Sequence, residues 1–109
     1  MILKIVPTPE FSKQAKKLSK NYKLITNDLK ELKEELLKNP KTGTELGNNC
    51  YKIRLANSSI PTGKSGGFRV ITYYIDKNDV IRLLSIYSKT QKDNITDKEL
   101  QEVIEKNNL

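Results

Sequence analysis

The spacing of apolar residues in the first 40 positions predicts a short strand followed by two helices. Residues 2–6 form a brief apolar run that stops at Pro7. Apolar residues then recur at helical spacing over two stretches, at Phe11, Ala15, Leu18 and Tyr22 and again over residues 24–37. Thr8 is a suitable N-cap before Pro9 at the first helical position. The second helix should end before Pro40, because the residue preceding a proline disfavours helical geometry. With a turn at residues 20–23, we expect a helical hairpin.

The second half of the chain changes to a period of two, which is typical of strands. After a Gly- and Asn-rich connection at residues 42–49, positions 50–55 alternate between two faces. One face carries Tyr51, Ile53 and Leu55, and the other carries Cys50, Lys52 and Arg54. A long loop at residues 57–67 follows. Residues 68–75 and 80–87 are β-branched and aromatic runs joined by a polar turn at 76–79. Their near-continuous apolarity indicates a sheet centre covered by the helical hairpin.

A last helix begins at a capping box. Thr96 and Glu99 have the required spacing, and Ile95 and Leu100 are placed as a hydrophobic staple. The apolar stripe of this helix is narrow, so we expect it to be the most loosely held element. The predicted order β-α-α-β-β-β-α groups helices and strands, which favours an α+β fold with an antiparallel-dominated sheet. At 109 residues, the chain is predicted to be a single domain, residues 1–109.

The charge distribution favours partners that carry phosphate. Twenty Lys and Arg residues against thirteen Asp and Glu give a net charge of +7. Residues 11–27 hold five lysines and no acid, residues 41–92 hold nine cations against three acids, and the last seventeen residues are acidic. A basic surface attracts phosphates over about 8 Å at physiological salt. Ordinary surface solubility is the alternative explanation, but two basic regions and an acidic tail look more like an electrostatic footprint.

Several site classes are excluded by composition. The sequence has no histidine, so Ser-His and Cys-His nucleophiles and imidazole metal sites are absent. Gly63-Lys64-Ser65 is similar to the end of a phosphate-binding loop, but Ser58 stands where that motif needs glycine, and a strand follows. We therefore expect no metal and no small-molecule cofactor.

The location of the protein is predicted from what its sequence lacks. No apolar stretch approaches the roughly 20 residues that cross a bilayer, and residues 1–7 are apolar over too short a distance for a signal peptide. A lone cysteine fits a reducing compartment. We expect a cytoplasmic protein with no membrane partner.

Cations carried by the predicted strands are the candidate chemistry. The set comprises Lys52 and Arg54 on one strand, Arg69 at the start of the next, Lys64 in the loop between them and Lys89 after the last strand. If these strands are neighbours, the cations converge on one basic concavity, and Tyr51, Tyr73 or Tyr87 could stack on a base. The alternatives are a solvated outer sheet face for Lys52 and Arg54, and core packing for Tyr73 and Phe68.

Three stretches, at residues 50–55, 64–74 and 83–89, resemble the core of the RelE/ParE-superfamily toxins. The Lys-Ser-Gly-Gly stretch at residues 64–67 is most similar to the HigB-like branch, and residues 8–11 and 39–47 fit as well. The resemblance implies a RelE-like fold and a type II toxin that cleaves mRNA in the ribosomal A site and pairs with an antitoxin. It places the basic strand residues of that site at Lys52 and Arg54, the phosphate-stabilising arginine at Arg69 and a further cation at Lys89. Some RelE members carry a catalytic tyrosine near the closing helix, where this sequence has Ile95, so Tyr87 is the candidate substitute.

This chemistry needs neither histidine nor metal. The 2′-hydroxyl loses a proton, attacks the adjacent phosphorus and expels the 5′-oxygen. Clustered cations disfavour one another's charge, which brings a lysine such as Lys52 or Lys89 nearer to general-base range. Arg54 and Arg69 would stabilise the charge that develops on phosphorus. Three alternatives remain open from sequence: a ParE-like toxin that inhibits DNA gyrase by binding, a non-catalytic RNA-binding module and a degenerate toxin.

Overall fold

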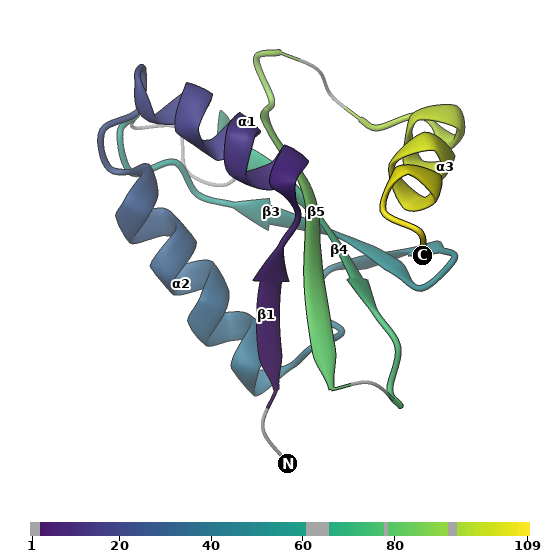
Figure 1. Cartoon of the computed structure of the whole chain (residues 1–109). Helices are drawn as coiled ribbons and strands as arrows, with labels where there is room; N and C mark the ends of the chain where they lie inside the picture. Colours follow the sequence, from purple (N-terminus) through teal and green to yellow (C-terminus); the bar gives the residue numbers. More distant parts are fainter. Residues whose placement is uncertain (1–2, 61–65, 78, 92–93) are drawn as a thin grey trace.

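The computed structural model describes residues 3–60, 66–77, 79–91 and 94–109. In chain order the elements are β1 (Lys4–Pro7), α1 (Pro9–Ser19), α2 (Ile25–Lys38), β2 (Thr44–Gly47), β3 (Cys50–Leu55), β4 (Phe68–Tyr74), β5 (Val80–Ser88) and α3 (Asp97–Lys106). The strands form one sheet in the order β1-β5-β4-β3-β2. The α1–α2 hairpin covers one face of this sheet, and α3 lies on the other face (Figure 1). The α+β prediction with an N-terminal helical hairpin is confirmed.

The sheet is antiparallel except at one edge. β1 runs parallel to β5, and the β2–β3, β3–β4 and β4–β5 pairs are antiparallel. The prediction that residues 42–49 are only a connection is wrong, because they contain β2. This strand has one apolar residue, Leu46, so no alternation of apolar and polar residues predicts it. The tight turn into β3 forms it: Asn48 and Asn49 both have positive φ, at 53° and 65°, as a two-residue hairpin turn of type I′ requires.

The predicted helix starts are confirmed. The Thr8 hydroxyl accepts a hydrogen bond from the Phe11 N–H at 3.2 Å and donates one to the Leu83 carbonyl at 2.9 Å, which ties the start of α1 to β5. In α3 both hydrogen bonds of the Thr96–Glu99 capping box are present, each at 3.1 Å. Local capping chemistry therefore fixes where these two helices begin.

Two apolar clusters hold the layers together. The larger one lies between the helical hairpin and the sheet, and Phe68 at its centre packs edge-to-face on Tyr22 with ring centroids 5.5 Å apart. The smaller one lies between α3 and the opposite sheet face and contains Cys50, Ile71, Leu84, Tyr87, Leu100 and Ile104. Within the residues described, no helix is both long and apolar enough to cross a membrane.

Candidate nucleic-acid interface

The three central strands place three of the predicted site residues in one row. On β3 and β4, Arg54 lies directly opposite Arg69, and Arg69 in turn lies opposite Tyr87 on β5. Residues opposite each other in an antiparallel sheet share a face, with Cβ atoms about 4.5–5.5 Å apart. Their chain neighbours Leu55 and Phe68 belong to the hairpin core, so the row lies on the other face, which α3 covers in part. We call Arg54, Arg69 and Tyr87 the cross-strand row.

The members of the row differ in exposure. Arg54 is exposed, whereas Arg69 is only 3% exposed and Tyr87 only 4%. The Arg69 guanidinium donates a hydrogen bond to the Phe68 carbonyl at 3.2 Å. Arg69 is therefore a cation held beneath the surface, beside an arginine that reaches solvent.

Lys52 lies on the same face as Arg54, two residues along β3 and opposite Ile71. Its side chain is half-buried, and its Nζ donates a hydrogen bond to the Asn94 Oδ1 at 2.8 Å. Asn94 belongs to the segment that leads into α3. No local sequence signal links Asn94 to a strand 42 residues earlier, so this contact is not predictable from the sequence.

Lys89 is exposed just past the end of β5, and its backbone N–H donates to the Gly67 carbonyl at 3.0 Å. At Gly67 the chain passes so close to β3 that an added Cβ would sit 2.2 Å from the Leu55 carbonyl oxygen. These contacts hold Lys89 at the end of the sheet where the cross-strand row lies. Lys64, predicted to join this group, lies outside the described residues.

The two remaining predicted tyrosines lie away from the cross-strand row. Tyr51, 9% exposed, packs into the hairpin core on the opposite face of the sheet, so the structure does not bring it to the cations. Tyr73 is on the cation face but half-buried against the α3 cluster, between Cys50 and Arg82 in the register. Phe68 is fully buried, which confirms its predicted core role.

A buried carboxylate anchors the loop that follows β3. Asp28 on α2 is 1% exposed and accepts hydrogen bonds from the Ser58 hydroxyl and, at 3.0 Å, from the Ser58 backbone N–H. Nearby, the Leu24 N–H donates to the Ser59 hydroxyl at 3.0 Å. The sequence signal for such a contact is an acid on the apolar face of a helix, where a carboxylate needs a hydrogen-bonding partner.

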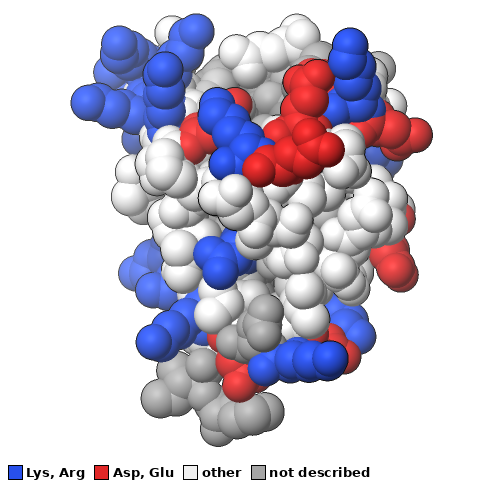
Figure 2. Space-filling model, turned by 45° about the vertical axis from the view of Figure 1, so that its right-hand side comes forward, with Lys and Arg blue, Asp and Glu red and all other residues white. Residues whose placement is uncertain are grey.

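Charge is unevenly distributed over the surface. Figure 2 shows blue side chains gathered at the upper left of the view and red ones grouped beside them. The five lysines between residues 11 and 27 are all exposed: Lys13, Lys16, Lys17, Lys20 and Lys23.

The structure shows no group of three or more His, Cys, Asp or Glu residues placed to hold a metal ion in the part of the chain that it describes.

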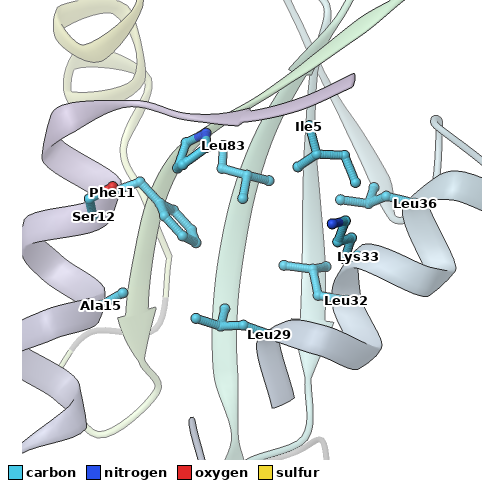
Figure 3. Close-up of a pocket in the computed structure, with 10 residues that line it drawn as sticks. Ile5, Phe11, Ser12, Ala15, Leu29, Leu32, Lys33, Leu36 and Leu83 are labelled. Atoms are coloured by element: carbon cyan, nitrogen blue, oxygen red, sulfur yellow. The ribbon is translucent and has the colours of Figure 1, made fainter. Parts of the chain in front are cut away.

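A groove of about 420 Å³ runs between the two helices of the hairpin and the β1–β5 edge of the sheet. Figure 3 shows Phe11 and Ala15 of α1 on one side, Leu29 and Leu32 of α2 on the other and Leu83 between them. The groove is apolar apart from Ser12 and Lys33, and it lies on the sheet face opposite the cross-strand row.

Comparison with known proteins gives a family and a fold. Residues 3–107 match the family model described as RelE toxin of the RelE/RelB toxin–antitoxin system. No curated protein sequence matches the chain. Among solved structures, a mutant of the E. coli toxin RelE in the free state superimposes with a TM-score of 0.63 at 20% identity, covering 97% of this chain and 98% of that one.

Two further E. coli structures contain the antitoxin. The RelE mutant in complex with an antitoxin RelBc peptide gives a TM-score of 0.59 at 21% identity and covers 94% of each chain. The intact RelBE toxin–antitoxin complex gives 0.57 at 24% identity, covering 77% of this chain and 93% of that one. At these identities the structural matches establish the fold.

Proposed function

The chain belongs to the RelE toxin family and is a toxin of a type II toxin–antitoxin system, and we propose that it is a ribosome-dependent mRNA endoribonuclease that inhibits translation. The observation that carries the proposal is the register of β3, β4 and β5, which aligns Arg54, Arg69 and Tyr87 on one sheet face. Lys52 and Lys89 flank this row. Lys52 precedes the row by two residues on β3 and Lys89 follows it by two residues, just past the end of β5, and this arrangement supports a joint role for the five groups.

The proposed reaction uses the RNA's own hydroxyl. Lys52 or Lys89 accepts the proton of the 2′-hydroxyl, whose oxygen then attacks the adjacent phosphorus. The bond from phosphorus to the 5′-oxygen breaks, the leaving oxygen takes up a proton, and a 2′,3′-cyclic phosphate and a 5′-hydroxyl result. Tyr87 is the candidate donor of that proton. Arg54 and Arg69 stabilise the negative charge on the phosphoryl oxygens, as a planar guanidinium does well.

Exposure suggests an order of contact. Arg54 and Lys89 are exposed and would meet the RNA backbone first. Arg69, at 3% exposure, reaches a phosphate only after covering side chains move aside. The ribosome would hold the substrate in place, and such positioning can lower the activation free energy by about 7–11 kcal/mol, because the reacting groups no longer lose entropy in the reaction step. A site with few groups can therefore suffice.

The decisive experiment is Arg69→Ala in a reconstituted translation system, with mRNA cleavage read by primer extension. Losing one charge-stabilising donor should lower the cleavage rate about 10²–10³-fold. Arg82→Ala is the matched control, because Arg82 lies on the same strand as Tyr87, opposite Tyr73 and away from the row. Undiminished cleavage by Arg69→Ala would remove Arg69 from the mechanism. The wild-type protein should leave DNA gyrase supercoiling unaffected, which separates this function from a ParE-like one.

We also propose a cognate antitoxin and a cytoplasmic location, where translating ribosomes are found. Two of the E. coli RelE structures contain an antitoxin or an antitoxin peptide. A toxin with net charge +7 favours an acidic, partly disordered segment that covers the cationic face or replaces α3. Co-expression of the neighbouring reading frame should restore growth. Assignment to the HigB-like branch rests on residues 64–67 and stays a prediction.

A further inference from the structure

One face of α1 is strongly basic. Lys13, Lys16, Lys17 and Lys20 follow the i, i+3, i+4, i+7 spacing that places side chains on a single helix face, and all four are exposed. The buried residues of α1, Phe11 and Leu18, lie on the opposite face. At about 3.6 residues per turn, the four ammonium groups cover the two turns from Lys13 to Lys20, the C-cap of α1. We call these four residues the α1 lysine face.

Within the described residues, none of these four lysines forms an ion pair. The two ion pairs seen are Lys106–Glu10 at 3.2 Å and Lys41–Asp76 at 3.3 Å. The first of them neutralises Glu10, the one acid of α1. The neighbouring helix α2 has a different surface, because its exposed lysines alternate with Glu31, Glu34 and Glu35. The α1 lysine face therefore carries four ammonium groups without an ion-pair partner among the described residues, whereas acids are interspersed among the lysines of α2.

The α1 lysine face meets the proposed reaction site at a hollow of about 240 Å³. The hollow is lined by Gln14, Lys17 and Leu18 from α1, Ile86 and Tyr87 from β5, and Gln91. Tyr87 is the end of the cross-strand row. Lys17 and Tyr87 thus line one concavity, so an RNA strand bound along the cross-strand row would continue past Tyr87 to the α1 lysine face.

The β5 edge at this hollow is closed to a peptide strand. β1 ends opposite Leu83, so the next residues of β5 have no strand partner on that side. The Ile86 N–H instead bonds to the Gln14 Oε1 at 2.9 Å, and the Ser88 N–H bonds to the Gln91 Oε1 at 3.2 Å. The edge donors that would pair with an added strand are occupied. What the hollow offers is the Lys17 ammonium and the Gln14 amide nitrogen, which has no partner within the described residues.

We propose that the α1 lysine face binds the phosphate backbone of RNA and extends the cross-strand row through the hollow at Lys17. The inference rests on the proposed function and adds a surface that touches no reacting atom. Ammonium groups on flexible stems bind phosphates as point charges, without base specificity. The RNA can be the mRNA strand or ribosomal RNA, and the two sources share this chemistry.

The test compares two triple variants that remove the same charge. Lys13→Gln/Lys17→Gln/Lys20→Gln changes the α1 lysine face, and Lys30→Gln/Lys33→Gln/Lys38→Gln changes exposed lysines on α2 as the control. Affinity is measured for a 2′-O-methylated, uncleavable RNA oligonucleotide at several salt concentrations. The α1 variant should lose about tenfold or more in affinity, and its salt slope should fall by about 2, since each phosphate contact to a single strand contributes about 0.7. The control variant should change less than about twofold, as expected for a surface without phosphate contacts.

Further measurements identify the source of the RNA. If less of the α1 variant than of the wild type co-sediments with mRNA-free ribosomes, the bound RNA is ribosomal RNA. If binding is lost only with mRNA-programmed ribosomes or with the oligonucleotide, the bound RNA is mRNA. In single-turnover cleavage, the α1 variant should need a higher ribosome concentration than the wild type to reach half of its maximal rate. Equal losses in both triple variants, or no loss in the α1 variant, would overturn the proposal. Loss of binding to an acidic antitoxin peptide with RNA affinity intact would overturn it too, because the face would then belong to the antitoxin.

Failure of this proposal and failure of the proposed function are distinguishable. If the wild-type protein does not cleave mRNA, the oligonucleotide measurement still reports whether the α1 lysine face binds RNA. If the wild-type protein cleaves and the α1 variant binds and cleaves equally well, the nuclease proposal stands and the surface proposal falls.

Discussion

Replacing Asp28 with alanine should release the loop after β3 from α2. Asp28 is 1% exposed and accepts two hydrogen bonds from Ser58. Hydrogen bonds to a charged group contribute about 1.5–3 kcal/mol each. Two effects reduce the net loss: Ser58 is exposed, so water can replace its partner, and the variant no longer buries a carboxylate. We expect the free energy of unfolding to fall by about 2–3 kcal/mol, a large part of the 5–15 kcal/mol typical of a domain.

The assay is urea unfolding followed by circular dichroism, with linear extrapolation to water. Ser58→Ala removes the hydroxyl donor and keeps the backbone N–H, so its loss should be smaller, near 1 kcal/mol. Combining the two substitutions in a double-mutant cycle should give a coupling energy of about 0.5–3 kcal/mol. Asp76→Ala is the matched control, because the Asp76 side chain is 69% exposed and its removal should change stability little.

Two results would refute this reasoning. The first is an unfolding midpoint of Asp28→Ala equal to that of the wild type. The second is strict additivity in the cycle, which would mean that Asp28 and Ser58 do not interact in solution. Amide exchange offers an independent check. In Asp28→Ala the amides of Ser58 and Ser59 should exchange faster, whereas β4 amides should lose no more protection than the fall in global stability accounts for.

Three further predictions concern other parts of the fold. Thr96→Ala removes the hydroxyl of the capping box and should lower the stability of α3 by about 1 kcal/mol, which amide exchange in α3 would report as a faster rate. In the wild-type protein, α3 amides that are as well protected as those of β4 would show that this helix is not loosely held. Gly43→Ala should destabilise by more than about 1 kcal/mol in urea unfolding, because φ is +104° and the new Cβ would lie 2.4 Å from the Lys52 carbonyl oxygen; Gly47→Ala, with positive φ and open space, should lose less. Burial raises the pKa of the Cys50 thiol to about 11, so at pH 8 iodoacetamide should alkylate the native protein much more slowly than the urea-unfolded chain. Because the unfolded thiol ionises first, the same shift should lower stability as the pH rises from about 9 toward 11; equal alkylation rates for native and unfolded protein would contradict both statements.

The local elements of this protein follow from short-range signals in its sequence. The starts of α1 and α3 and the end of α2 follow from caps and prolines, signals that act within three or four residues. Alternation along residues 50–55 also separated the two faces of β3, and it already set Tyr51 apart from Lys52. The prediction that Tyr51 binds RNA ran against that pattern, and the structure places it in the hairpin core.

The contacts between distant segments depend on the folded arrangement of the sheet and helices. That arrangement pairs Arg54 with Arg69 and Arg69 with Tyr87, joins Lys52 to Asn94, and bonds Asp28 to Ser58. None of these contacts has a periodic signal, since each joins residues on different elements that loops bring together. The register between strands depends on burying one whole face of the sheet at once, because a slip of one residue would turn every side chain to the other face. That collective constraint acts on the folded sheet, so the site it assembles cannot be read from any single segment.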